Sequence, residues 1–154
     1  MAGFEVITEG KQLRNRFFQV GHSGALPSLA RFPALRHLSL ANDPLHGLDG
    51  LPNFPSLETL DLANTDISDT DLAAVGRLAS LRQLNISENA IAGTGRQHFA
   101  SLTKLTELTL DQDDMLTDDA LAALSTISSL EKLSLCGAGA DGEGLNALLS
   151  LREP

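Results

Sequence analysis

One short leucine pattern recurs along the chain and constrains its fold more than any other feature. The pattern Leu-x-x-Leu-x-Leu, with isoleucine in the last place once, begins at residues 35, 57, 81, 105 and 130. The starts are 22, 24, 24 and 25 residues apart, and another apolar residue follows at position 11 of each unit: Leu45, Ile67, Ile91, Met115 and Ala140. A fixed period of about 20 to 50 residues is typical of repeat architectures. We therefore number positions within each repeat from its first leucine.

Each repeat has the composition of one strand, one turn and one return segment. A unit this short cannot bury its leucines alone, so neighbouring units must stack and bury a continuous ladder. We expect parallel strands at or near residues 35–40, 57–62, 81–86, 105–110 and 130–135. Apolar residues three apart predict helices or 3₁₀ turns within 71–81 and 119–130, with Ser68 and Thr117 as N-caps. In the first repeat, Pro52 and Pro55 exclude a long helix.

From about residue 26 onward, these repeats resemble the leucine-rich-repeat family, whose consensus is L-x-x-L-x-L-x-x-N-x-L. With Thr65 at position 9, and Ile-Ser-Asp at 67–69 or Leu-Thr-Asp at 116–118, these repeats of 22–25 residues look most like the bacterial type. The resemblance implies an α/β solenoid, a horseshoe segment with parallel strands on the concave face and short helices or 3₁₀ turns on the convex face. In the family, the Asn at position 9 hydrogen-bonds the turn backbone. The five residues at this position are Asp43, Thr65, Asn89, Asp113 and Ala138; Ala138 cannot form that bond, so the last turn should be the loosest.

The repeats predict one leucine-rich-repeat domain over residues 1–154. Residues 1–30 would be an N-terminal cap or a degenerate repeat, and residues 31–154 would hold about five repeats. At the N-terminus, the first leucine layer could be covered by Phe4, Val6, Phe17, Phe18 and Val20. At the other end no cap is visible, although Leu145, Leu148 and Leu151 have the spacing of a return segment. An open edge at strand 130–135 would favour a homodimer through the C-terminal edge, or further sequence beyond Pro154.

Charge and composition limit the kinds of partner. The formal net charge is −9, which opposes binding to nucleic acid or to an anionic membrane and suits a neutral or basic protein. A single cysteine excludes an internal disulfide, and the N-terminus lacks the basic and apolar regions of a secretory signal. There is no run of about 18 apolar residues that could span a membrane. We expect a cytoplasmic protein, with signal-less export as an effector left open.

Three motifs suggest chemistry, and each has a simpler explanation. Residues 137–142 match G-x-G-x-x-G, but no second strand and no acidic residue about 20 positions on can follow. The acidic run 111–119 lacks the ligands of a calcium loop, with Met115 at its fifth and Leu116 at its sixth position. Cys136 would lie four strands from His37, too far for a catalytic pair. We expect no enzyme activity, no catalytic residue, no cofactor and no metal.

The candidate partner-binding residues lie between the leucines of the strands, where side chains leave the concave face. They are mostly small or polar: Arg36, His37, Ser39, Thr59, Asp61, Gln83, Asn85, Glu107, Thr109, Asp111, Lys132 and Ser134. Positions 2, 3, 5, 7 and 8 of the five repeats carry six acids and three bases, a difference of −3. We expect a protein–protein interaction module that binds through this face. A solvated face without a partner, or an assembly element that self-associates through the C-terminal repeat, are the alternatives.

Overall fold

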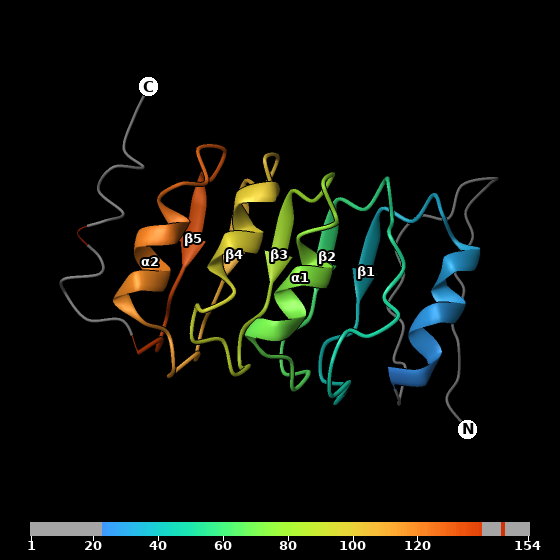
Figure 1. The fold of residues 1–154 in the computed structure, drawn as a ribbon, viewed down its shortest axis with the longest axis horizontal. Coiled ribbons are helices and arrows are strands. Elements are labelled where there is room, and N and C mark those ends of the chain that lie inside the picture. The colour runs from blue at the N-terminus through green and yellow to red at the C-terminus, as the bar shows by residue number, and fades with distance from the viewer. Residues whose placement is uncertain (1–22, 140–145, 147–154) are drawn as a thin grey trace.

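The computed structural model describes residues 23–139 and residue 146, and it contains a single parallel sheet. The five strands lie in chain order (Figure 1). They are β1 (His37–Ser39), β2 (Thr59–Asp61), β3 (Gln83–Asn85), β4 (Glu107–Thr109) and β5 (Lys132–Ser134). Equivalent positions pair across all of them, so that Leu38, Leu60 and Leu84 are in register. The predicted solenoid is confirmed, with each strand centred in its predicted range and shorter than it.

Short helices cover one side of this sheet (Figure 1). They are η1 (Ser23–Arg31), η2 (Asp69–Asp71), α1 (Leu72–Val75), η3 (Arg96–Ser101) and α2 (Asp118–Leu124). Ser68 and Thr117 are the N-caps of η2 and α2, as predicted, and Thr117 accepts a hydrogen bond from the Ala120 amide at 3.3 Å. The structure describes no helix between β1 and β2, the segment that holds Pro52 and Pro55. There is no helix among the described residues that is long and apolar enough to cross a membrane.

The core is a stack of aliphatic layers, one layer for each position of the repeat. The leucines and isoleucine at positions 1, 4 and 6 of the first four repeats are buried. Leu26 and Leu29 of η1 extend this core before the first repeat. At the other end, Leu133 and Leu135 are only partly buried, whereas their counterparts in β4, Leu108 and Leu110, are fully buried. The leucine layers are therefore less completely covered at β5.

The structure corrects one predicted core position. The repeat pattern places Met115 at position 11 of the fourth repeat and predicts that it is a core residue. Its side chain is instead 59% exposed, and Leu116 is buried. The Leu116 amide donates to the Asp113 carbonyl at 3.0 Å. The turn therefore closes one residue later than the position numbering of the repeat predicts. The extra residue of this repeat thus lies before the apolar position, and it turns Met115 outward.

A left-handed residue follows each strand at position 8 of the repeat. The φ angles there are 62° at Asn42, 54° at Asn64, 56° at Glu88, 58° at Gln112 and 69° at Gly137. Asn and Gly adopt this conformation readily, but longer side chains adopt it rarely. We call positions 7–11 of the repeats, residues 41–45, 63–67, 87–91, 111–116 and 136–139, the turn edge.

Position 9 of the third repeat links its turn to the turns on both sides. Asn89 donates to the carbonyl oxygens of Leu62 and Ile86, both at 2.8 Å, and its own amide donates to Asp113 Oδ1 at 2.9 Å. One carboxyl oxygen each of Asp113 and Asp43 is buried without a hydrogen-bond partner. Burial raises the pKa of Asp113 to about 7, assisted by the nearby carboxylates of Asp111 and Asp114. The predicted bonding role of this position is therefore filled completely by Asn89, also by Thr65, whose hydroxyl donates to the Leu62 carbonyl at 2.7 Å, and in part by Asp113.

Turn conformation and close packing account for two of the glycines in the G-x-G-x-x-G match, one each. Gly137 occupies the left-handed position of the last turn, with φ 69°. A Cβ on Gly139 would lie 2.3 Å from the carbonyl oxygen of Asp114, a distance that real side chains do not reach. Both glycines thus have a structural role in the turn. Ala140, the N-terminal cap residues Phe4 to Val20, and Leu145, Leu148 and Leu151 lie outside the described residues.

Candidate partner-binding face

The twelve candidate residues lie together on the face of the sheet opposite the helices. Within β1, β2 and β4 the middle residue is buried and its two neighbours are half-buried, which places positions 3 and 5 on this outer face. Arg36 immediately precedes β1, and Asp111 lies two residues after β4. Thr109 is aligned with Asn85 and Ser134 across the sheet. We call this surface the sheet face, which corresponds to the predicted concave side.

Position 3 of the repeats forms a polar chain across all five strands. His37 Nδ1 lies 3.0 Å from Thr59 Oγ1, which donates to Gln83 Oε1 at 3.1 Å. The Gln83 amide donates in turn to Glu107 Oε2 at 3.1 Å, and Lys132 pairs with Glu107 at 2.5 Å. These side chains hold one another in place, so a partner meets a partly ordered polar surface rather than free side chains.

Acceptors at positions 5 and 7 are anchored by local donors. Asp61 accepts from the Ala63 amide through Oδ1 and from Ser39 Oγ through Oδ2, both at 3.2 Å. Asp111 Oδ1 accepts from Ser134 Oγ at 2.6 Å and from the Cys136 amide at 2.8 Å. Because each carboxylate oxygen has more than one lone pair, these groups retain acceptor capacity toward a ligand.

Two ion pairs neutralise charges of the sheet face near the starts of the strands. The Arg36 guanidinium bonds the Glu58 carboxylate and holds its pKa below the usual range. In the second pair, the hydrogen bond to Glu107 stabilises the charged form of Lys132 and raises its pKa. Within the described residues, no ion pair is formed by the remaining charged residues of this face: Asp61, Arg82, Glu88, Asp111 and Glu131. Four acids against one base leave the predicted excess of −3.

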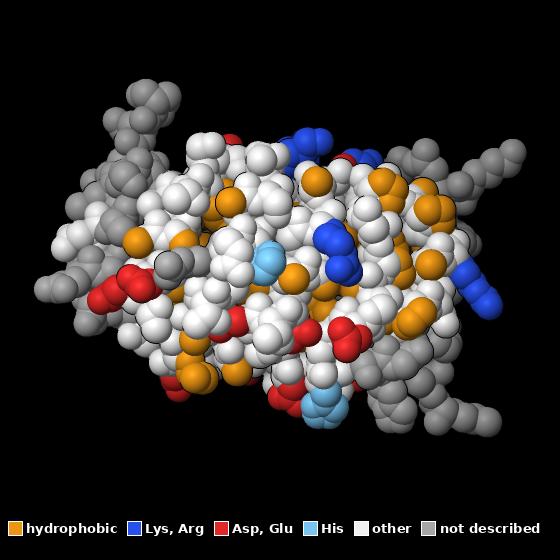
Figure 2. All heavy atoms as spheres, in the orientation of Figure 1, with side chains coloured by type: hydrophobic (Ala, Val, Ile, Leu, Met, Phe, Trp, Pro, Cys, Tyr) orange, Lys and Arg blue, Asp and Glu red, His pale blue; other side chains and the backbone are white. Residues whose placement is uncertain are grey.

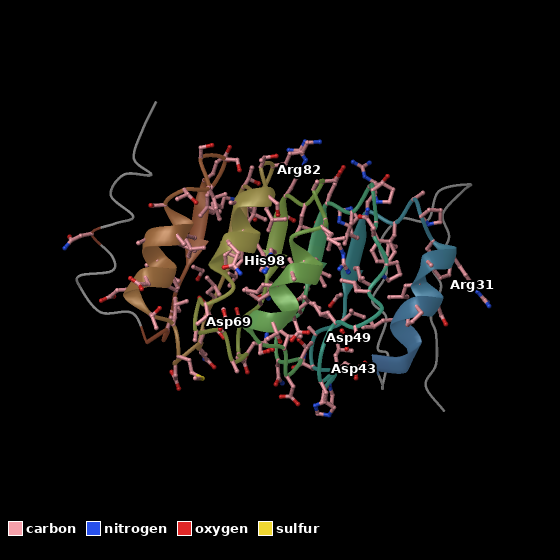
Figure 3. The ribbon with its side chains drawn as sticks, viewed as in Figure 1. Arg31, Asp43, Asp49, Asp69, Arg82 and His98 are labelled. Carbon is pink, nitrogen blue, oxygen red and sulfur yellow. The ribbon has the colours of Figure 1, made fainter. Side chains whose placement is uncertain are left out.

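Three of these four acids, Asp61, Glu88 and Asp111, lie at or after the ends of their strands, whereas Glu131 precedes β5. Figure 3 shows Arg82 at one edge of the sheet and Asp43 at the opposite, turn edge. The turn edge contains six acids and neither lysine nor arginine: Asp43, Asp66, Glu88, Asp111, Asp113 and Asp114. Of these six, Asp43 and Asp113 are buried and Asp66 lies beside His46, so the exposed negative charge of the turn edge comes mainly from Glu88, Asp111 and Asp114.

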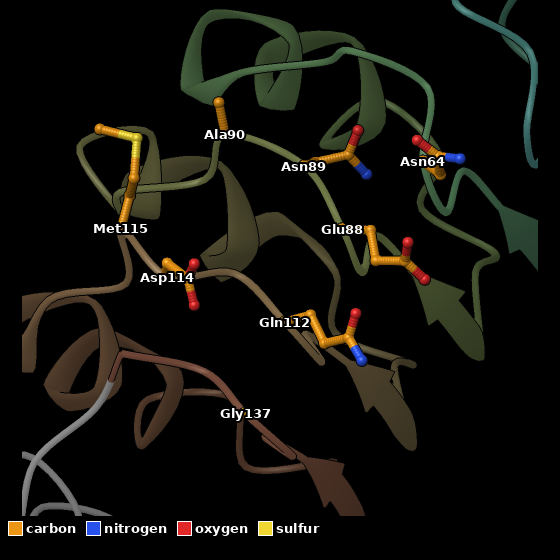
Figure 4. Close-up of a pocket in the computed structure, with 8 residues that line it drawn as sticks. All are labelled: Asn64, Glu88, Asn89, Ala90, Gln112, Asp114, Met115 and Gly137. Carbon is orange, nitrogen blue, oxygen red and sulfur yellow. The ribbon is translucent and has the colours of Figure 1, made fainter.

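A pocket at the turn edge was not predicted from the sequence. It has a volume of about 560 Å³ and is lined by Asn64, Glu88, Asn89, Ala90, Gln112, Asp114, Met115 and Gly137. The close-up in Figure 4 shows these residues on successive turns. For comparison, Figure 2 shows the surface of the molecule from the helix side. Two features of the sequence lie at this pocket, the extra residue of the fourth repeat and the long side chains at position 8, but neither of them alone indicates a pocket.

The pair considered for catalysis, Cys136 and His37, lies far apart in the described part of the chain. Cys136 is exposed and follows β5, whereas His37 begins β1, at opposite ends of the sheet. His46 lies 3.3 Å from Asp66 at the turn edge, in an exposed pair. In the part of the chain that the structure describes, no three His, Cys, Asp or Glu side chains are arranged to hold a metal ion.

Comparison with known proteins supports the repeat assignment. Residues 55–115 match the model of the family described as leucine rich repeat. The chain contains leucine-rich repeats. Among solved structures, it is similar to a tropomodulin C-terminal domain from Caenorhabditis elegans, with a TM-score of 0.56 and 21% identity. That alignment covers 84% of this chain and 90% of the other, and at this identity the likeness concerns the fold alone. The comparison with curated proteins found no match.

Proposed function

We propose that this leucine-rich-repeat domain is a protein–protein interaction module that binds a neutral or basic protein through its sheet face. The observation that carries the proposal is the outer face of the sheet, a continuous polar surface across five strands with three of its four unpaired acids on one side. Leucine-rich repeats position side chains and leave specificity to the surface. We further propose that the protein is bacterial, and that it is either cytoplasmic or exported as an effector.

The proposal is supported by the order of the face before any partner binds. Side chains that are already hydrogen-bonded lose less conformational entropy when a partner binds, which favours affinity. Complementary charge speeds the encounter with a basic protein. The face contains no Trp or Tyr, the side chains that commonly dominate interface energies. Recognition here would thus depend on polar and charged contacts, and it would weaken as salt concentration rises.

Reversing two unpaired carboxylates tests the sheet face. We expect Asp61→Lys/Asp111→Lys to weaken partner binding by about tenfold or more at low salt, because attraction becomes repulsion. The partner would first be identified by cross-linking to the whole chain and mass spectrometry. Its affinity would then be measured with purified protein by calorimetry, with thermal denaturation of each variant as a folding check.

A matched variant carries the same change of charge away from the sheet face. Asp49 and Asp119 are both exposed, and Asp119 belongs to α2 on the helix side. The Asp49→Lys/Asp119→Lys variant should retain most of the affinity. Equal losses in the two variants would mean that net charge, and not this face, governs binding. Unchanged affinity in both would exclude the sheet face as the electrostatic contact.

The second candidate function is assembly through the C-terminal repeat. It is favoured by the partial exposure of Leu133 and Leu135, whose β4 counterparts are buried. Parallel pairing with β4 uses one edge of β5, and no strand among the described residues pairs with its other edge; an open strand edge beside apolar surface is a template for another chain.

Sedimentation velocity across a micromolar to millimolar concentration series tests self-association. We expect a reversible dimer at the upper end of the series, since edge pairing between identical strands gives a two-fold contact. A Leu135→Lys variant, checked for folding by circular dichroism, should remain monomeric. A sedimentation coefficient of the unmodified chain that stays at the monomer value throughout would reject this assembly.

A further inference from the structure

The turn-edge pocket differs from the rest of the surface in its combination of charge and apolar exposure. Glu88 and Asp114 are both exposed acids in its lining, which contains no lysine or arginine. Among the described residues, Met115 is the one large hydrophobic side chain that is mostly exposed, at 59%. An apolar side chain beside two carboxylates suits a ligand that is itself both cationic and apolar.

Backbone geometry fixes these side chains around the pocket. Glu88 and Gln112 occupy left-handed positions, with φ angles of 56° and 58°, where Asn or Gly stand in the other three repeats. Their amides donate to the carbonyl oxygens of Asp111 and Cys136, both at 2.9 Å, which continues the sheet ladder into the turns. Long side chains at such positions cost stability, and costs of this kind are concentrated at functional sites.

The extra residue of the fourth repeat completes the pocket. Because Leu116 takes the core position, Met115 is displaced to the surface at the pocket's margin, beside Asp114, which is exposed like the position-10 residues of the preceding repeats. Asn64 and Gln112 add amide groups, whose oxygens can accept from a planar cation with several donors. An arginine guanidinium presents five such donors in one plane, which suits two carboxylates and neighbouring amide oxygens better than a lysine ammonium does.

We propose that the turn-edge pocket binds an arginine side chain of the protein partner, with an adjacent apolar residue of that partner packed on Met115. The inference rests on the proposed function in one respect, that the ligand belongs to a protein. It differs from that function in place, since the pocket lies beside the sheet face and requires neither Asp61 nor Glu107.

The two methionines of the chain, Met1 and Met115, allow a direct test. The whole chain labelled with ¹³C at the methionine methyl groups gives a signal for Met115 itself. We would titrate it with the peptide acetyl-Leu-Arg-Leu-amide and with the same peptide carrying citrulline, the neutral isostere, or lysine. The expected result is a saturable shift of the Met115 signal with the arginine peptide, about tenfold weaker with citrulline and intermediate with lysine.

Two charge-matched double variants locate the contact. Glu88→Gln/Asp114→Asn removes the carboxylates of the pocket, and Asp61→Asn/Glu107→Gln removes two from the sheet face. We expect about a tenfold loss of arginine-peptide affinity in the first and less than about twofold in the second. Each variant's thermal denaturation and the unaffected Met1 signal control for folding and for non-specific shifts.

The outcomes separate the two proposals. Loss in the pocket variant alone supports the arginine site. Loss in the sheet-face variant alone, equal loss in both, or no Met115 shift with the arginine peptide would overturn it. In the first of these three cases, the sheet-face proposal would stand while the pocket proposal fails. If only the pocket variant loses affinity for the peptide, and the partner still requires Asp61 and Asp111, then both surfaces contribute to partner binding.

Discussion

Replacing Leu84 with aspartate is expected to unfold the domain. Leu84 lies at the centre of β3, is 2% exposed and is aligned with Leu60 on one side and Leu108 on the other. The substitution removes a packed side chain, which costs about 2 to 5 kcal/mol, and buries a charge without a partner, which costs several more. Together these approach the whole stability of a small domain, about 5 to 15 kcal/mol. The measurement is thermal denaturation followed by circular dichroism, and Leu60→Asp should behave in the same way.

The neighbouring position separates burial from charge. Gln83 is adjacent to Leu84 in β3, but its side chain is exposed on the sheet face. Gln83→Asp introduces the same charge there; it loses the hydrogen bond to Glu107 and places two carboxylates opposite each other, so we expect a loss of about 1 to 2 kcal/mol, well below that of Leu84→Asp. A Leu84→Asp protein that melts cooperatively at the temperature of the unmodified chain would contradict the ladder architecture.

The strand arrangement could be predicted from the sequence because it depends on a periodic burial requirement. Every repeat needs its leucines at positions 1, 4 and 6 in one layer, and this alone fixes the parallel order and the register of Leu38, Leu60 and Leu84. The position of the extra residue in the fourth repeat does not follow from the period. Met115 and Leu116 are both apolar, and only the geometry of the turn decides that Leu116 is buried.

The candidate site was predictable in part for a similar reason. The alternation of a strand places position 3 on the outer face, so His37 and Lys132 could be assigned to it from the sequence. The hydrogen-bonded chain between them depends on rotamers of side chains 22 to 25 residues apart. The pocket could not be predicted, because it forms between turns of neighbouring repeats and depends on left-handed residues such as Glu88.

Position 9 of the fourth repeat makes the stability of the domain depend on pH. Asp113 is fully buried; its Oδ1 accepts the Asn89 amide, and its Oδ2 has no hydrogen-bond partner. In the preceding repeat, the Asn89 side-chain amide donates to the carbonyls of Ile86 and Ser87 at 2.8 and 2.9 Å. A carboxylate at this position can accept hydrogen bonds but has no proton to donate to carbonyls.

The direction of the pH dependence follows from the raised pKa of Asp113. Burial raises this pKa from an ordinary value of 3.8 to about 7 in the folded chain. Between those values the folded state binds more protons than the unfolded state, so stability falls as pH rises. The contribution of Asp113 is fully present below about pH 4, declines through the interval to about pH 7, and is lost above it. A shift of this size corresponds to about 4 kcal/mol at most.

Substitution with asparagine should remove this dependence. Asp113→Asn has no ionisable group and can donate to the turn carbonyls as Asn89 does. We expect the variant to exceed the unmodified chain in free energy of unfolding by about 2 to 4 kcal/mol at pH 8, with a much smaller difference at pH 4. Urea denaturation across this pH range measures the difference directly. Asp114→Asn, an exposed neighbour, controls for the general loss of a negative charge and should give a nearly constant difference. A difference between Asp113→Asn and the unmodified chain that does not grow from pH 4 to pH 8 would show that Asp113 is ionised in the folded protein throughout, and that its buried oxygen is stabilised by a donor other than its own proton.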